Sequence, residues 1–387
     1  MELDADKEIF FSLLKAGLWE GEVKISAESD ADWGKILRLA EEQSVVGLMA
    51  AATEHMKSMT VPQEWALQFI GEALAIEQRN KAMNAFVGEL MERLQEAGIR
   101  ALLVKGQGIA QCYERPLWRT CGDVDLFLNE EDYAKAKDLL LPGASSVEEE
   151  HKKKKHQGMT IDGWVVELHG RLYSGLSSRV ERVMDDIRQD TFCNEQVRSW
   201  MNGKSPIILM KAENDAFYVF THILGHFYKG GIGLRQICDW CRLLYTYKDT
   251  LNHELLESRI KKAGLMTEWK AFGALAVKYL GMPVEAMPLL RSSSTSEAAK
   301  PITNAQEFKK FKRKADRIME FVMMSGNFGH NRDMSYYSKY PYLMRKCISM
   351  GRRISDLFRH ARIFPMDSLL FSFSIINNGI RSAVRGE

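Results

Sequence analysis

Asp123 and Asp125 lie two residues apart in the segment 122–128. Apolar residues alternate with them, as on a strand with one buried face, so both carboxylates are expected on the same side of that strand. Like charges this close repel each other unless a cation neutralises them, and Mg²⁺ takes carboxylate oxygens together with phosphate oxygens. The pair therefore predicts a magnesium site. The alternative is an ordinary half-exposed strand whose aspartates face water.

A third carboxylate, Glu167, lies in an alternating run over 164–169. The pair Asp162-Gly163 joins this run to another over 156–161, and Asp-Gly between two extended runs indicates a β-hairpin. If the strand of Glu167 lies beside the strand of the two aspartates, three carboxylates can hold two divalent ions, as in enzymes of in-line phosphoryl or nucleotidyl transfer. His169 is expected on the same face as Glu167, either beside the metals or as a plain strand-end residue.

A candidate phosphate-binding segment, Lys105-Gly106-Gln107-Gly108, follows the short apolar run 99–104, which is typical of a buried strand. A short helix is expected over 109–114, and backbone N–H groups at such a strand-to-helix turn can bind phosphate. Lys105 and Arg119 carry positive charges that could neutralise a triphosphate. The segment therefore predicts a nucleotide site next to the carboxylates.

Three elements together resemble the bacterial "nucleotidyltransferase family protein" group of the DNA polymerase β-like nucleotidyltransferase superfamily. They are Val104-Lys105-Gly106, the segment Arg119-Thr120-Cys121-Gly122-Asp123-Val124-Asp125-Leu126, and Val165-Val166-Glu167-Leu168-His169. The same elements are similar to nucleotidyltransferase toxins of abortive-infection systems. The resemblance covers residues 95–172. It extends more weakly to His222, Gly233, Arg235 and Asp239. The wider superfamily has Gly-Ser where this chain has Lys105-Gly106.

The resemblance implies an Mg²⁺-dependent enzyme that moves an NMP from ATP or another NTP to a hydroxyl or phosphate acceptor. The implied ligands of two Mg²⁺ ions are Asp123, Asp125 and Glu167. The acceptor stays open between a small molecule, a peptide, a protein and a tRNA, and nucleic acid is not favoured. The residues expected to bind the nucleotide are Lys105, Gly106, Gln107, Arg119, His222 and Arg235.

A non-catalytic protein on the same fold, which binds a nucleotide or a partner, is the rival interpretation. The missing serine of Gly-Ser supports it. The intact set of three carboxylates opposes it, because a pure binding protein has little reason to keep their mutual repulsion.

Several other residues allow two interpretations. The basic run His151 to His156 could steer a triphosphate or a nucleic acid, or it could be a solvated loop offset by neighbouring glutamates. His222 and His226, four residues apart on one helix face, could line the nucleotide pocket or belong to the core. Arg235 and Asp239 have the spacing of a helix ion pair. Cys238 and Cys241 are interpreted as buried helix positions rather than as a zinc or redox site.

The elements that must position these residues predict an α+β fold. A minimal nucleotidyltransferase core with a short mixed sheet, residues 96–172, is expected between two large all-helical regions, residues 1–95 and 173–387. In the N-terminal region, amphipathic runs extend over 33–49 and 65–94. In the C-terminal region, helices are expected over 207–227, 233–247, 252–264, 266–280, 305–325, 341–360 and 366–378.

Composition narrows the class of protein further. The 387 residues include 53 basic and 51 acidic side chains, a formal net charge of +2 that does not favour wholesale polyanion binding. The six cysteines are widely spread, so a disulfide framework is not expected. The acidic start does not resemble a signal peptide, and no uncharged apolar run is long enough to span a membrane. A cytoplasmic protein is therefore expected.

Overall fold

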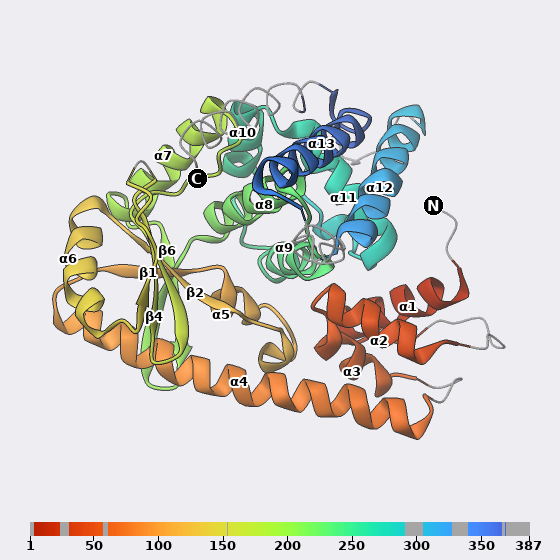
Figure 1. Cartoon of the computed structure of the whole chain (residues 1–387), viewed down its shortest axis with the longest axis horizontal. Helices are drawn as coiled ribbons and strands as arrows, with labels where there is room; N and C mark the ends of the chain where they lie inside the picture. The colour runs from red at the N-terminus through yellow and green to blue at the C-terminus, as the bar shows by residue number, and fades with distance from the viewer. Residues whose placement is uncertain are drawn as a thin grey trace.

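The structure is a computed structural model that describes residues 4–23, 31–56, 61–152, 154–290, 305–326, 340–365 and 368. Within these residues, seven strands form one mixed sheet, and helical regions lie at both ends of the chain (Figure 1). The α+β class expected from the sequence is confirmed. Most of the helix expected over 366–378 lies outside the described residues.

The N-terminal region is helical, as expected. Asp4 and Asp32 accept hydrogen bonds from backbone N–H groups three residues on, which is the usual way to start a helix. The amphipathic run over 33–49 forms two helices rather than one, because Ser44 adopts a positive φ of 55° between them. The helices are α1 (Ala5–Trp19), α2 (Trp33–Glu42), α3 (Val46–Thr53) and the 34-residue α4 (Gln63–Glu96).

The sheet has the order β3-β4-β5-β2-β1-β7-β6. At its centre β2 pairs antiparallel with β1 and parallel with β5. The expected hairpin is confirmed: β4 pairs with β5 through the turn at Asp162 and Gly163, which both have positive φ. The strands are β1 (Ala101–Val104), β2 (Asp123–Leu128), β3 (Ser146–Val147), β4 (His156–Ile161), β5 (Trp164–His169), β6 (Val197–Asn202) and β7 (Ser205–Met210).

The hairpin of β6 and β7 corrects the expectation that the chain is helical from about residue 175. The helix expected over 207–227 begins only at Ala212. Residues 205–210 instead form β7, which pairs with β1 in parallel through Leu103 and Leu209. Without β7 the backbone of β1 would be an unpaired edge of the sheet. As a strand, this segment also buries the side chains of Ile207 and Leu209.

Helices cover both faces of the sheet. On one face α4 and α6 (Glu130–Leu140) pack their apolar side chains against Val124, Leu126 and Leu128. In Figure 1, α4 passes below the sheet with one part and below the N-terminal helices with the other, and it contacts β1, β7, α2 and α3. Because side chains alternate along β2, Asp123 and Asp125 share the opposite face with the buried Phe127. The carboxylates therefore face the C-terminal helices.

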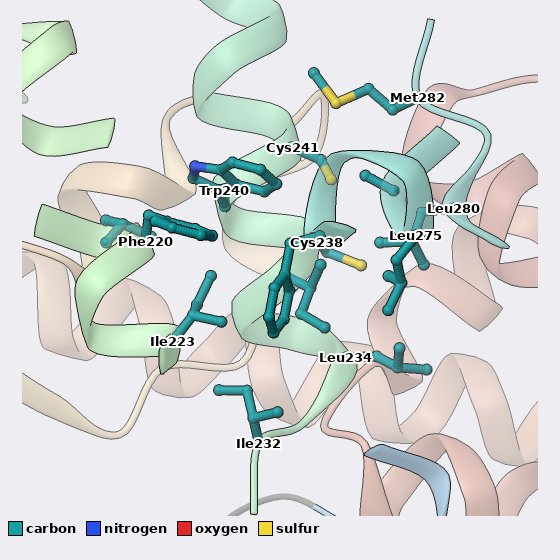
Figure 2. Close-up of a cluster of buried hydrophobic side chains, with 14 of the residues drawn as sticks. Phe220, Ile223, Ile232, Leu234, Cys238, Trp240, Cys241, Leu275, Leu280 and Met282 are labelled. Carbon is teal, nitrogen blue, oxygen red and sulfur yellow. The ribbon is translucent and has the colours of Figure 1, made fainter. Parts of the chain in front are cut away.

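The C-terminal helices surround α8 and α9, which carry several candidate site residues. Cys238 and Cys241 lie on α9 among apolar side chains of neighbouring helices, such as Phe220 and Leu275 (Figure 2). Both thiols are free and fully buried, so they are core positions, as expected. The helices are α7 (Ser178–Phe192), α8 (Ala212–Lys229), α9 (Leu234–Thr246), α10 (His253–Ala263), α11 (Met266–Leu280), α12 (Ala305–Ser325) and α13 (Tyr342–Ala361). None of the described helices is both long and apolar enough to cross a membrane.

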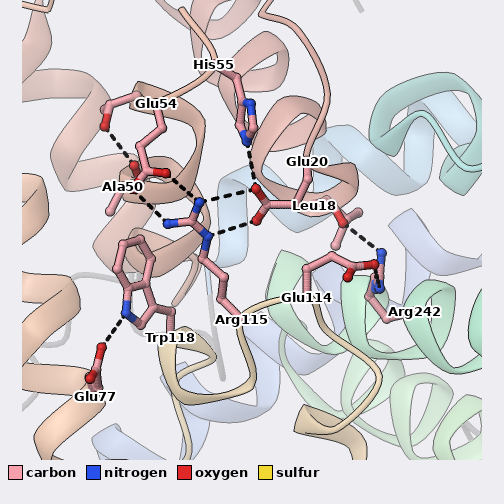
Figure 3. A network of polar contacts seen from close by, with 11 residues as sticks. Leu18, Glu20, Ala50, Glu54, His55, Glu77, Glu114, Arg115, Trp118 and Arg242 are labelled. Atoms are coloured by element: carbon pink, nitrogen blue, oxygen red, sulfur yellow. Dashed lines mark hydrogen bonds and ion pairs between the residues drawn. The ribbon is translucent and has the colours of Figure 1, made fainter.

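The segment between β1 and β2, which contains the short α5 (Gly106–Ala110), is tied to the N-terminal helices by a polar network (Figure 3). Arg115 binds Glu20 and Glu54, and its guanidinium lies over the ring of Trp118. Trp118 in turn donates a hydrogen bond to Glu77 of α4. The N-terminal helices therefore hold in place the loop that leads into the aspartate strand.

Candidate active site

The three predicted carboxylates meet where β2 and β5 lie side by side. In the parallel register of these strands, Asp125 is opposite Glu167. Carboxylate oxygens of Asp123, Asp125 and Glu167 all lie within 4.8 Å of one another. Asp125 is buried, whereas Asp123 and Glu167 are half-buried. The three carboxylates were expected to meet only if their two strands were neighbours. The strands are neighbours, and the cluster is present.

Two cationic or potentially cationic groups bind the central carboxylate. Lys105 Nζ lies 2.7 Å from Asp125 Oδ1, and His169 Nε2 lies 2.8 Å from the same oxygen. Burial lowers the pKa of Lys105, but the charges of Asp125 and its neighbours outweigh burial and raise that pKa above its ordinary value. The pKa of His169 is also raised, because its hydrogen bonds to Asp125 and Glu167 outweigh burial. Lys105 thus faces a carboxylate here, and its expected contact with phosphate stays a prediction.

Asp123 bears much of the charge repulsion of the site, which Lys105 and Arg235 offset only in part. The charge of Asp125, and then burial, raise its pKa above the ordinary value. In the described part of the chain, its side chain forms no hydrogen bond or ion pair. Three carboxylates with hard oxygen atoms, one of them without a partner, fit a divalent cation such as Mg²⁺. A bound cation would relieve the repulsion that these residues now bear.

Two histidines hold Glu167 from the other side. Its Oε2 lies 3.1 Å from His156 Nε2 and 3.4 Å from His169 Nε2. These hydrogen bonds hold the pKa of Glu167 well below its ordinary value. His156, Glu167 and His169 also lie close enough to hold a metal ion themselves, with nitrogen ligands that suit zinc better than magnesium.

The contact of His156 with Glu167 was not predicted. From the sequence, His156 was expected in a basic run and at the start of the strand over 156–161, with no role at the carboxylates. Its position could have been found from the hairpin, because a two-residue turn at 162–163 fixes the register and places His156 opposite His169.

Arg119 and Asp239 form a buried pair beneath the aspartates. Arg119 Nε and Nη2 lie 2.9 and 2.6 Å from the two oxygens of Asp239, and Tyr113 donates a third hydrogen bond to this carboxylate. The remaining Nη1 of Arg119 contacts Thr120 O and Cys121 Sγ. Asp239 is therefore bound by Arg119 and not by Arg235, whose sequence spacing had suggested a helix pair.

A small cavity of about 50 Å³ brings together most of the predicted residues. Arg235 donates to Thr120 O, while its Nε is buried without an acceptor. Burial, followed by the charge of Lys105, holds the pKa of His222 well below its ordinary value, so this imidazole is neutral. The predicted residues that line the cavity are Lys105, Gly106, Arg119, Asp123, Asp125, His222 and Arg235.

Gln107 is the predicted nucleotide-binding residue that the structure does not bring to the site. Its side chain is buried, donates a hydrogen bond to Asn80 of α4 and lines neither cavity near the carboxylates. This hydrogen bond places the glutamine in the packing of the turn against α4.

A larger cavity of about 260 Å³ lies on the other side of Lys105 and His222. Glu167 and His169 of the sheet line it, together with residues of α8 such as His226. The two cavities share only Lys105 and His222 among their lining residues. Lys105 and His222 therefore lie between a small compartment lined by the two aspartates and a larger one lined by Glu167.

Comparison with known proteins agrees with this geometry. A family described as "Uncharacterised nucleotidyltransferase" matches residues 29–281, which is more than half of the chain and includes the sheet and both cavities. No curated protein and no solved structure matches the chain. From the extent of the family match, the protein belongs to this family of nucleotidyltransferases.

Proposed function

We propose that the protein is an Mg²⁺-dependent nucleotidyltransferase that moves an NMP from an NTP to a hydroxyl or phosphate acceptor. The observation that carries the proposal is the convergence of Asp123, Asp125 and Glu167 on neighbouring strands of a chain in this family. We also propose that the protein is cytoplasmic, which is the compartment expected from its sequence.

The three carboxylates would hold Mg²⁺, which when bound lowers the pKa of an attacking hydroxyl and stabilises charge on the leaving group. In the transfer, the acceptor oxygen bonds to the α-phosphorus. The bond from that phosphorus to the bridging oxygen breaks, pyrophosphate leaves with the electron pair, and a hydroxyl acceptor gives its proton to solvent. The low pKa of Glu167 favours a role as ligand over a role as general base.

Positive charge on the donor side comes from the protein itself. Lys105 and Arg235 line the small cavity with the two aspartates, and the buried Nε of Arg235 has no acceptor. At about 10–15 Å³ per water-sized sphere, the cavity has room for an ion and a few small groups. The sugar and base of an NTP would therefore lie outside it.

The test is a thermal-shift titration with ATP, GTP, CTP and UTP, each with and without Mg²⁺. A ligand that binds only the folded state raises Tm, so we expect a shift that needs both nucleotide and Mg²⁺. The double variant Asp123→Asn/Asp125→Asn should lose that shift, whereas the exposed control Asp249→Asn should keep it. An unchanged shift in the double variant would refute the proposed metal site.

The Lys105–Asp125 ion pair favours one rival function, a nucleotide-binding protein without catalysis. In that case Lys105 would permanently take the place of a metal ion beside Asp125. Nucleotide would then raise Tm equally with and without Mg²⁺, and no pyrophosphate would be released on prolonged incubation with any candidate acceptor. Mg²⁺-dependent release of pyrophosphate would exclude this rival.

A further inference from the structure

The larger cavity differs from the smaller one in its charge. Four lysine or arginine side chains line it, Lys105, Lys154, Arg171 and Lys229, and Glu167 is the one carboxylate among its lining residues. That carboxylate is already bound by His156 and His169. The cavity therefore has an excess of positive charge that its own lining does not balance.

Two of these cations have no anionic partner. Lys105 is paired with Asp125, and Arg171 with Asp185. In the described part of the chain, by contrast, Lys154 and Lys229 form no ion pair. Lys154 lies over the ring of Tyr173, with its Nζ 5.1 Å from the ring centre. Two lysines that line one cavity and form no ion pair have the charge to bind an anion.

The pKa of Lys229 is consistent with this picture. Burial lowers it from the ordinary value, and the positive charge of Lys154 lowers it further, against the opposing charge of Glu181. Glu181 Oε1 accepts hydrogen bonds from the hydroxyl and backbone N–H of Ser174 and from the backbone N–H of Gly175, whereas its Oε2 is buried without a hydrogen-bond partner among the described residues. Glu181 therefore offsets part of the charge of Lys229 without forming an ion pair with it. An anion placed between the two lysines would remove their mutual repulsion.

The histidines of α8 leave the cavity open to such an anion. Burial, and then the charge of Lys105, lower the pKa of His226 to about 4, so this imidazole is neutral near pH 7. His222 is neutral for the same reasons. Neutral imidazoles can donate a hydrogen bond to an anion without themselves requiring a counter-charge.

The position of the cavity indicates which substrate the anion belongs to. Asp123 and Asp125 line the small compartment, whereas Glu167 lines the large one. A donor phosphate held at the aspartates and an acceptor held in the larger cavity would thus meet at the carboxylate cluster. The volume of about 260 Å³ is that of a small-molecule site and not that of a groove for a long polymer.

We propose that this cavity binds the acceptor, and that the acceptor is a small phosphate-bearing molecule whose phosphate is held by Lys154 and Lys229. The assignment to the acceptor rests on the proposed nucleotidyl transfer, but the phosphate site itself does not. The cationic lining matches a doubly charged phosphate better than a single carboxylate, because two lysines that form no ion pair line the same cavity.

Calorimetric titration with inorganic phosphate, in the absence and presence of saturating Mg²⁺ and ATP, tests the proposal. Removing both charged donors in Lys154→Ala/Lys229→Ala should weaken phosphate binding by at least about tenfold. The double variant Lys204→Ala/Lys312→Ala, which removes the same charge from exposed positions, should leave phosphate binding unchanged. Phosphate and Mg²⁺-ATP should bind the wild-type protein simultaneously.

Three results would overturn the proposal. Phosphate binding that is unchanged in Lys154→Ala/Lys229→Ala would remove the site. Competition between phosphate and Mg²⁺-ATP would assign the cavity to the phosphates of the nucleotide. Displacement of phosphate by a ten-nucleotide single-stranded RNA, at lower concentrations than by glycerol 3-phosphate, would assign the cavity to a nucleic acid. If wild-type protein binds phosphate at these lysines but never binds Mg²⁺-ATP, only the proposed nucleotidyl transfer fails.

Discussion

Lys105 and Asp125 form an ion pair at the point where the two cavities meet, with 2.7 Å between Nζ and Oδ1. Lys105 precedes α5 and has a φ of 57°, so the sharp turn after β1 directs this side chain back towards the aspartate strand. The residue that stands in place of a glycine in the wider superfamily thus neutralises a metal-binding candidate. It offers its positive charge to both compartments.

Replacing Lys105 by methionine should destabilise the metal-free protein and increase its response to Mg²⁺. Loss of one partner of a buried pair leaves Asp125 with only His169, which should lower the free energy of unfolding by about 3 kcal/mol. The three carboxylates then repel each other more, so added Mg²⁺ should restore more stability than it adds to wild type.

Urea denaturation with and without Mg²⁺ measures both effects of this substitution. Lys105→Arg is the matched control because it keeps the charge at nearly the same length. If Lys105→Met responds to Mg²⁺ less than wild type does, then Lys105 helps to assemble the metal site and does not compete with the ion.

The Arg119–Asp239 pair should support the site mainly through stability. Both side chains are buried, with 5% exposure each, so Asp239→Asn leaves a guanidinium without its counter-charge. We expect a loss of about 3–5 kcal/mol in the free energy of unfolding. The double variant Arg119→Met/Asp239→Leu should be more stable than Asp239→Asn alone, because it leaves no buried charge unpaired. Denaturation of the double variant and of its two single variants, Arg119→Met and Asp239→Leu, gives the coupling energy, and strictly additive losses would contradict the buried pair.

The sequence predicted the site best where the local pattern determines the geometry. Alternation on β2 placed Asp123 and Asp125 on one face, and the Asp162-Gly163 turn placed Glu167 on a strand. That β5 lies beside β2 in parallel is a long-range pairing, which the sequence could state only as a condition. The family resemblance implied the same pairing, because it makes Asp123, Asp125 and Glu167 ligands of the same metal ions.

Other features depended on contacts far apart in the chain. The hairpin of β6 and β7 was missed because its apolar residues run directly into those of α8, and a short apolar run does not separate strand from helix. Arg119 was expected to face phosphate, but it binds Asp239, which lies 120 residues away. No spacing within either segment indicates that partnership.

Acid should remove the contribution of the Arg115 network to stability. The hydrogen bond from Arg115 holds the pKa of Glu54 below its ordinary value of 4.5. A carboxylate whose pKa is lower in the folded state stabilises the fold at pH values above its unfolded pKa, and this contribution is lost as the pH falls through the folded pKa. The stability difference between wild type and Arg115→Ala should therefore be largest at neutral pH and shrink below about pH 4.5.

Denaturation of both proteins between pH 7 and pH 3 checks the Arg115 network. Arg38→Ala, at an exposed site on α2, is the control for the loss of an arginine charge. A difference that stays constant over this range would mean that Arg115 stabilises the protein through its packing on Trp118 and not through its charge.

The two sets of residues that could hold a metal ion should prefer different ions, one hard and one softer. Asp123, Asp125 and Glu167 offer only oxygens, which Mg²⁺ prefers, whereas His156, Glu167 and His169 offer two imidazole nitrogens, which suit Zn²⁺. Asp123→Asn should therefore weaken Mg²⁺ binding strongly and Zn²⁺ binding little, and His156→Ala should do the reverse. Glu167→Gln should weaken both, because Glu167 belongs to both groups. Calorimetric titration of each variant with each ion measures this pattern. If His156→Ala impaired Mg²⁺ binding as much as Asp123→Asn, the hydrogen bond that orients Glu167 would matter as much to the magnesium site as the carboxylate of Asp123.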